Sequence, residues 1–143
     1  MENKIFRNFI SNKGLKLTKE RLAVLNEIFS FRGHFEPEQL YLRIKDSEIK
    51  ASRASVYRTL NLLVESGLVG KVARTEKGNV YEQTFGQEHH DHMICDRCGA
   101  IIEFCSQKIE NLQDELCKKN NFDGTSHNLV IRGLCKKCKR TKR

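Results

Sequence analysis

The segment HHDHMICDRCGAIIEF at residues 89–104 decides how this chain is interpreted. It joins a run of metal-donor side chains to a CxxC knuckle, and a second CxxC knuckle lies close to the C-terminus. Two such knuckles supply four thiolates, which complete the closed tetrahedral shell that zinc favours and leave no open position for chemistry. The sequence therefore predicts a structural Zn²⁺ site formed by Cys95, Cys98, Cys135 and Cys138. Redox or iron–sulfur chemistry is the alternative.

The run at the start of this segment contains His89, His90, Asp91 and His92. Alternate residues of a strand share a face, so His90 and His92 would point one way and His89 and Asp91 the other. This geometry can serve two metal sites, and the competing interpretation is a solvated polar linker. Further possible ligands are His34, Glu82, Glu103, Glu110 and His127, so all five histidines of the chain belong to the set. Mixed nitrogen and oxygen donors suit reversible binding of Fe²⁺, Mn²⁺, Zn²⁺ or Co²⁺.

Helical periodicity dominates the chain before this segment. A helix over 3–13 is expected to turn Ile5 and Phe9 inward, with Phe6 as a further candidate. Thr18 and Ser52 are expected to cap later helices. A helix beginning at Glu36–Pro37 lies between them, and a strand–turn–strand pattern over 68–82 follows the last helix. Helices followed by a hairpin are typical of a winged helix-turn-helix.

The second half predicts strand, knuckle, strand, helix, strand and knuckle. Its helix, at 106–119, is expected to bury Ile109, Leu112 and Leu116. The predicted fold class is thus α+β, with an N-terminal winged helix-turn-helix and a C-terminal α/β dimerisation domain carrying the four-cysteine zinc site. The expected boundaries are 1–84 for the first domain, 85–91 for a hinge, and 92–143 for the second domain with its basic tail.

The formal net charge is +8 and the isoelectric point is about 9.3, which favour a polyanionic partner. The basic excess lies in the N-terminal half and in the tail, while the region between them is acidic. The tail cations are Lys136, Lys137, Lys139, Arg140, Lys142 and Arg143.

The sequence lacks an apolar stretch of the roughly 20 residues that a membrane span needs. Its first residues are too polar for a secretory signal. We therefore expect a cytoplasmic protein with no membrane partner, whose cysteines bind metal rather than form disulfides. Cys105 and Cys117 are interpreted as partly buried thiols outside the zinc site.

The chain resembles the ferric uptake regulator (Fur) family over nearly its whole length. The residues that carry the resemblance are Gly14 to Thr18 with Arg21, Ser55 to Leu60, the segment 89–104, Ser126 to Leu129, and the final CxxC. The resemblance assigns the four cysteines named above to the structural zinc.

Three further sets of residues are implied by the resemblance. The regulatory metal site comprises His34, Glu82, His90, His92 and Glu103. An additional metal site comprises His89, Asp91, Glu110 and His127. The DNA contacts comprise Lys16, Arg21, Ser55, Tyr57 and Arg58, of which Lys16 matches a minor-groove lysine, and Tyr57 and Arg58 match base-contacting residues. An arginine suits guanine edges, and a tyrosine ring can contact a thymine methyl group.

The resemblance implies a metal-dependent repressor that binds an AT-rich inverted repeat in double-stranded DNA as a homodimer or tetramer. Fe²⁺-responsive control of iron uptake is the favoured activity, because Glu103 stands where peroxide-sensing relatives usually carry aspartate. Zinc sensing and peroxide sensing through iron or manganese are the alternatives within the family.

Two other classes of protein are less compatible with the sequence. A zinc hydrolase could use an open histidine–carboxylate site to activate water, but the chain has no HExxH motif and no evident nucleophile–base pair. A zinc-ribbon interaction module would not need the ordered helices and hairpin that precede the knuckles. We therefore expect a regulator and not an enzyme.

Overall fold

A computed structural model describes most of the chain and divides it into an N-terminal unit, Met1–Glu88, and a C-terminal unit, His89–Arg143. The described residues are 1–31, 33–76, 78–86 and 88–141. Lys77 of the expected turn, Gln87 of the expected hinge, and Lys142 and Arg143 of the basic tail lie outside them.

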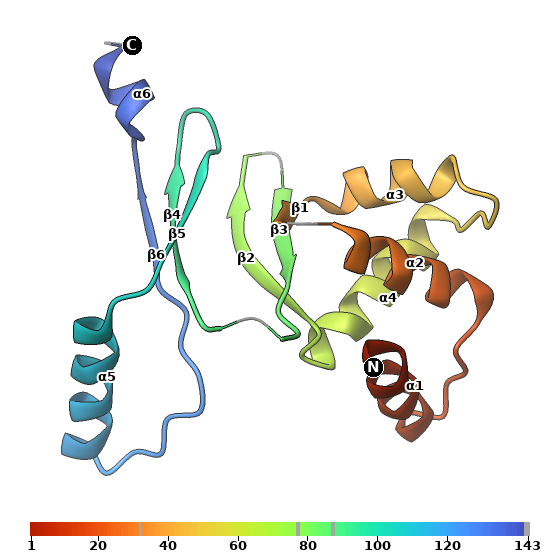
Figure 1. The fold of residues 1–143 in the computed structure, drawn as a ribbon, viewed down its shortest axis with the longest axis horizontal. Coiled ribbons are helices and arrows are strands. Elements are labelled where there is room, and N and C mark those ends of the chain that lie inside the picture. The colour runs from red at the N-terminus through yellow and green to blue at the C-terminus, as the bar shows by residue number, and fades with distance from the viewer. Residues whose placement is uncertain (32, 77, 87, 142–143) are drawn as a thin grey trace. The chain divides into compact units, whose positions relative to one another are not determined.

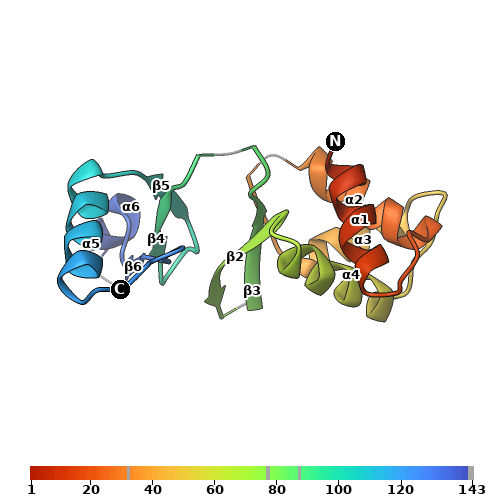
Figure 2. The same cartoon turned by 90° about the horizontal axis from the view of Figure 1, so that it is seen from below.

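The N-terminal unit consists of helices and a small sheet (Figure 1). Its strands pair in the order β1–β3–β2, and both pairings are antiparallel. Viewed from below, the four helices gather together and the β2–β3 hairpin follows α4 (Figure 2). The elements are α1 (Glu2–Asn12), α2 (Lys19–Ser30), β1 (His34–Phe35), α3 (Pro37–Lys45), α4 (Arg53–Glu65), β2 (Val69–Thr75) and β3 (Gly78–Gln83).

Local sequence signals set the helix ends in this unit. The Thr18 hydroxyl accepts a hydrogen bond from the Arg21 backbone N–H, and the Ser52 hydroxyl accepts one from that of Ser55, as N-caps do. Both caps were predicted from the sequence. Gly67, with φ of 82°, ends the turn after α4 in a conformation that a side chain would disfavour.

A single apolar core holds the helices against the sheet. Its fully buried larger side chains are Phe6, Ile10, Leu25, Ile28, Phe35, Leu40, Ile44, Leu60 and Leu63. The expectation for α1 was wrong at Ile5, which is 37% exposed, whereas the further candidate Phe6 is buried together with Ile10, and Phe9 is half-buried. The sequence IFRNFI offers two apolar faces about one residue apart, and only packing against the other helices selects one of them.

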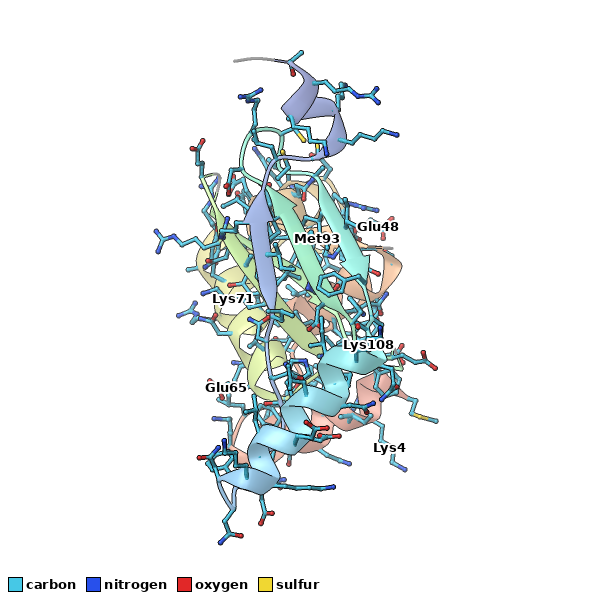
Figure 3. The ribbon with its side chains drawn as sticks, turned by 90° about the vertical axis from the view of Figure 1, so that its left-hand side faces the viewer. Lys4, Glu48, Glu65, Lys71, Met93 and Lys108 are labelled. Carbon is cyan, nitrogen blue, oxygen red and sulfur yellow. The ribbon has the colours of Figure 1, made fainter. Side chains whose placement is uncertain are left out.

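The C-terminal unit contains a three-stranded sheet with helices near its two ends (Figure 1). The strand order is β5–β4–β6, with β4 antiparallel to β5 and parallel to β6. Figure 3 looks onto this sheet, with Met93 labelled on the central strand. The elements are β4 (Asp91–Cys95), β5 (Ile101–Phe104), α5 (Gln107–Lys119), β6 (Val130–Gly133) and α6 (Lys136–Arg140).

Helix α5 differs from the expectation in the residues it buries. Leu112 and Leu116 are 56% and 51% exposed, and α5 contributes no fully buried residue. Ile109 is half-buried, as are Gln113 and Cys117 on the following turns. The spacing of the apolar residues on α5 was identified correctly. Within this chain, however, Leu112 and Leu116 do not pack against the rest of the unit.

The two units together confirm the α+β fold class, with a helical N-terminal part and a C-terminal sheet that carries four cysteines. Within the described residues, every helix is too short or too polar to span a lipid bilayer.

The N-terminal core offers a matched test of burial on one helix. Leu40→Ala removes a side chain that is 0% exposed, whereas Leu42 on the same helix is 50% exposed. We expect Leu40→Ala to lower the free energy of unfolding by about 2–5 kcal/mol and Leu42→Ala by under about 0.5 kcal/mol. Urea titrations followed by far-ultraviolet circular dichroism measure both. Equal losses would show that Leu40 does not belong to the core.

Candidate metal centres and DNA-binding surface

The four knuckle cysteines converge at one end of the C-terminal sheet. One sulfur from each of Cys95, Cys98, Cys135 and Cys138 lies within 4.8 Å of the other three. The Sγ atoms of Cys98 and Cys135 are 3.7 Å apart. Zinc–sulfur bonds of about 2.3 Å at tetrahedral angles would separate sulfurs by about 3.8 Å. The donor set and its spacing therefore fit a structural zinc.

The pKa values of these thiols also favour a bound cation. Hydrogen bonds from the backbone N–H groups of Cys98 and Cys135 lower the pKa of Cys95 to about 6, which favours its thiolate. Burial raises the pKa of the Cys138 thiol to about 12. Four thiolates cannot crowd together without a compensating charge, and a bound divalent cation deprotonates its coordinating thiols.

Arg97 joins the two knuckles, a role that the sequence analysis did not assign. Its Nη1 donates to the carbonyl oxygens of Cys138 and Thr141, at 2.9 and 2.8 Å. These carbonyls lie at the C-terminal end of α6, where a cation is favourable. No sequence signal marks this contact, because 41 residues separate Arg97 from Cys138.

A second cluster lies elsewhere in the C-terminal unit and contains the residues expected for the additional metal site. One ligand atom from each of His89, Asp91, Glu110 and His127 lies within 4.8 Å of the others. The two histidine Nε2 atoms are 2.8 Å apart, and each lies 3.3–3.5 Å from Asp91 Oδ1 and Glu110 Oε1. Two nitrogens and two oxygens at this spacing match a cation held by bonds of about 2.0–2.2 Å.

The burial of this cluster supports a metal site over an ordinary ion-pair network. Asp91 is 1% exposed, and its Oδ2 has no hydrogen-bond partner among the described residues. Glu110 Oε1 is also buried, and its contacts with the two histidines are too long or poorly aligned to count as hydrogen bonds. A buried carboxylate oxygen without a partner is costly, and a bound cation removes that cost.

The residues expected to form the regulatory site fall in both units. In the N-terminal unit, β1 and β3 place His34 opposite Glu82, with His34 Nε2 3.1 Å from Glu82 Oε2. Their side chains are only 17% and 9% exposed. Glu82 of the β2–β3 hairpin is thus held against His34 of β1, which lies much earlier in the sequence.

In the C-terminal unit, β4 and β5 place His92 opposite Glu103. His90 Nε2 lies 3.5 Å from Glu103 Oε1, and the ring centroids of His90 and His92 are 4.8 Å apart. The structure therefore brings His90, His92 and Glu103 together. It also separates them from His89 and Asp91, as the strand alternation predicts.

The residues expected to contact DNA lie on α4, in the loop before α2 and in the first turn of α2, where Arg21 is half-buried. Tyr57 is 41% exposed, and Arg58 beside it is also exposed. Ser55 is half-buried in the first turn of α4. Lys16 is exposed in the loop before α2, where its carbonyl accepts a hydrogen bond from Arg21.

The remaining cysteines stay outside these clusters. Cys105 is exposed at the end of β5, and Cys117 is half-buried on α5. Neither joins a group of metal-donor residues within the described part of the chain.

Comparison with known proteins gives these clusters their context. A model of the ferric uptake regulator family matches residues 12–132. The chain belongs to the ferric uptake regulator family. It is 39% identical over 139 residues to the ferric uptake regulation protein of Campylobacter jejuni, covering 96% of this chain and 88% of that protein.

Solved structures of the family also resemble this chain. The ferric uptake regulator of Helicobacter pylori, described as having three functional metal binding sites, matches with a TM-score of 0.79 and 35% identity. That match covers 94% of this chain and 89% of the other. A zinc uptake regulator complexed with zinc and DNA matches with a TM-score of 0.61 and 31% identity, covering 92% and 89% of the two chains. Membership makes the chain a metal-responsive transcription regulator and not an enzyme, which excludes the hydrolase alternative.

The thiolate site can be tested with a matched pair of cysteine variants. Wild-type protein should keep one tightly bound zinc per chain through dialysis against a mild chelator, measured by inductively coupled plasma mass spectrometry. We expect Cys98→Ser to lose that zinc and to destabilise the C-terminal unit, because three thiolates no longer close the shell. Cys105→Ser should retain it, since Cys105 lies outside the cluster. Retention of zinc in Cys98→Ser would contradict the assignment.

Proposed function

We propose that this regulator is an Fe²⁺-responsive repressor that binds an AT-rich inverted repeat as a homodimer and controls iron uptake. The observation that carries the proposal is the buried His34–Glu82 pair. It places a histidine and a carboxylate side by side in the unit that also carries the DNA-contact helix. These two donor types recur among His90, His92 and Glu103 in the other unit.

We assign His34, Glu82, His90, His92 and Glu103 to the regulatory metal. A cation bound to donors from both units would link them and favour one arrangement of the two DNA-binding units in a dimer. It can shift this equilibrium only by its difference in affinity between the arrangements. We place the DNA-binding domain at 1–84, the hinge at 85–91 and the metal-binding dimerisation domain at 92–143. The division of contacts after Glu88 falls inside this hinge and supports the boundaries.

The other two clusters are assigned different roles. The four-cysteine site holds structural zinc, because four thiolates leave no open position and bind too tightly for reversible sensing. The cluster of His89, Asp91, Glu110 and His127 is an additional metal site within the C-terminal unit. Its four donors come from one unit, so it stabilises that unit rather than reporting on the other.

Iron is favoured over the other signals by the comparisons. The relative in Campylobacter jejuni is a ferric uptake regulation protein, and it matches almost the whole chain. The ferric uptake regulator structure also resembles this chain more closely than the zinc regulator structure does. Histidine and carboxylate donors without thiolate suit Fe²⁺ but also bind Zn²⁺ and Mn²⁺. Zn²⁺ and Mn²⁺ are therefore titrated beside Fe²⁺ as competing signals.

The DNA contacts are assigned to Lys16, Arg21, Ser55, Tyr57 and Arg58. The exposed side of α4 that carries Tyr57 and Arg58 is the recognition surface, since the N-terminal part of such a helix contacts base edges in the major groove. Lys16 reaches the minor groove from the loop before α2, and Arg21 and Ser55 contact the DNA backbone.

A homodimer is supported by apolar residues that the single chain leaves exposed. Met93 pairs with Ile102 on one side and Ile131 on the other, and the three are 39–51% exposed. Leu112 and Leu116 add a second apolar surface on α5. A contiguous exposed apolar surface of this kind usually marks a protein interface, and a second copy supplies a self-complementary one.

The metal assignment predicts a specific pattern of DNA binding. Protein that retains only the thiolate zinc is titrated anaerobically with Fe²⁺, Mn²⁺ or Zn²⁺ on an AT-rich inverted-repeat duplex, using fluorescence anisotropy. Fe²⁺ should restore tight binding, and His90→Ala should lose this response. Wild-type protein that binds equally with and without metal would overturn metal gating. Restoration by Zn²⁺ alone at buffered low concentration would instead identify a zinc sensor.

His127→Ala is the control variant, because it removes one imidazole from the additional site and none from the regulatory set. It should keep most of the Fe²⁺ response. An equal loss of response in His90→Ala and His127→Ala would show that the two clusters do not have separate roles.

The proposed dimer surface can be tested by placing a charged side chain in it. Ile102→Glu places a carboxylate beside Met93 and should convert the dimer to a monomer, because burying an unpaired charge is costly. Ile49→Glu changes a similarly exposed isoleucine, at 42%, in the N-terminal unit and should leave the mass unchanged. Sedimentation equilibrium measures both. A dimer that persists in Ile102→Glu would place the interface elsewhere.

A further inference from the structure

Arg53 occupies an electrostatically unfavourable position that the assigned DNA contacts do not explain. It is the first residue of α4, and the first turn of this helix contains no acidic residue. A cation at a helix N-terminus opposes the helix dipole. The side chain is 58% exposed, so it is not needed to fill the core.

Helix α3 supplies the groups that hold Arg53 in place. Arg53 Nη2 donates to Glu38 Oε1 at 2.6 Å, and Nε donates to Glu38 Oε2 at 3.2 Å. The guanidinium carbon also lies 4.4 Å from the centre of the Tyr41 ring. Glu38 and Tyr41 are three residues apart on α3 and so share a face. The guanidinium is therefore fixed from two sides.

The geometry of this pair leaves one edge of the guanidinium available. Glu38 takes the side edge, formed by Nε–H and one N–H of Nη2. The end edge, with one N–H from each of Nη1 and Nη2, presents a second parallel pair of donors. A parallel pair of donors is the arrangement that recognises the O6 and N7 atoms of guanine in the major groove.

The location of Arg53 on α4 is suitable for contacting a guanine in the major groove. Tyr57 is four residues later and therefore on the same side of α4 as Arg53. Arg53, Tyr57 and Arg58 are all exposed. The first residues of a recognition helix are those that contact base edges.

We propose that Arg53 is a further specificity-determining residue, which recognises a guanine in each half of the operator while Glu38 and Tyr41 hold its guanidinium in position. This inference rests on α4 being the recognition helix, as the proposed function has it. Because the Glu38 carboxylate balances the charge of Arg53, the pair adds little to the general attraction for phosphates. Its contribution is to base preference.

The chain contains a matched control arginine. Arg43 on α3 is also bound to a glutamate, with Nε 2.6 Å from Glu27 Oε1, and its guanidinium carbon lies 4.2 Å from the centre of the Phe31 ring. It is 50% exposed, close to the value for Arg53. Arg43 lies in the last turn of α3 and is held by residues on and just after α2, not by groups near the start of α4. Arg43→Gln therefore removes the same charge and the same type of contacts.

The experiment selects duplexes from a random library with Fe²⁺-loaded wild-type, Arg53→Gln, Arg53→Lys and Arg43→Gln proteins, and then measures their affinities by anisotropy. Wild-type and Arg43→Gln should select the same half-site. Arg53→Gln should lose the guanine preference at one position, with affinity for the wild-type consensus about tenfold to a hundredfold weaker. Its affinity for a scrambled duplex should fall by less than about threefold.

Arg53→Lys keeps the charge but has no parallel donor pair, so it should lose the same guanine preference. Glu38→Gln should weaken consensus binding and strengthen binding to the scrambled duplex, because it leaves the Arg53 charge unbalanced. A purely structural ion pair would not change base preference in this way. Circular dichroism melts of each variant confirm that the helices remain folded.

Three results would overturn the inference and are distinguishable from one another. If Arg53→Gln selects the wild-type consensus unchanged, Arg53 does not read a base, although the proposed function stands. If wild-type protein selects no consensus at all, both the proposed function and this inference fail. Equal losses by Arg53→Gln on the consensus and scrambled duplexes would reduce Arg53 to a phosphate contact.

Discussion

The crowding of four cysteine sulfurs at one end of a small sheet is the constraint on which the C-terminal unit depends. Among its described residues, only Ile94, Cys95 and Cys138 are buried hydrophobic residues, and α5 buries none. Such a unit cannot obtain its stability from an apolar core alone. A zinc ion bound by the four thiolates would hold the β4–β5 turn to α6, and Arg97 adds hydrogen bonds between the same two segments.

The N-terminal unit, in contrast, has an extensive apolar core. Its helices surround a continuous apolar core, so α3 and α4 are held firmly without a metal. A rigid α4 is what a base-reading surface needs, because side chains that contact base edges must be oriented in advance. The Glu38–Arg53 pair extends this orientation from the core to the exposed end of the helix. Under the proposed roles, the affinity for DNA and the choice of DNA sequence depend on different features of this unit.

The period of a β-strand separates the metal sites in the C-terminal unit. Successive residues of β4 and its leading segment face opposite sides, so four adjacent donors are divided between two clusters. The cluster around Asp91 gathers donors from β4, α5 and the segment before β6. The cluster around Glu103 leaves His90 and His92 beside one carboxylate. These three donors are fewer than the five or six ligands of a complete shell of mixed nitrogen and oxygen donors.

The sequence by itself determined the features that depend on spacing. The CxxC pairs, the alternation over residues 89–92 and the caps at Thr18 and Ser52 follow from local geometry, and each appears where it was predicted. Tertiary structure decided the features that depend on which surfaces meet. The burial of Phe6 instead of Ile5, and the exposure of Leu112 and Leu116, follow from packing and not from period. The Arg97 and Arg53 contacts join residues 41 and 15 positions apart, and no local pattern could predict them because such contacts exist only once the helices and strands are folded together.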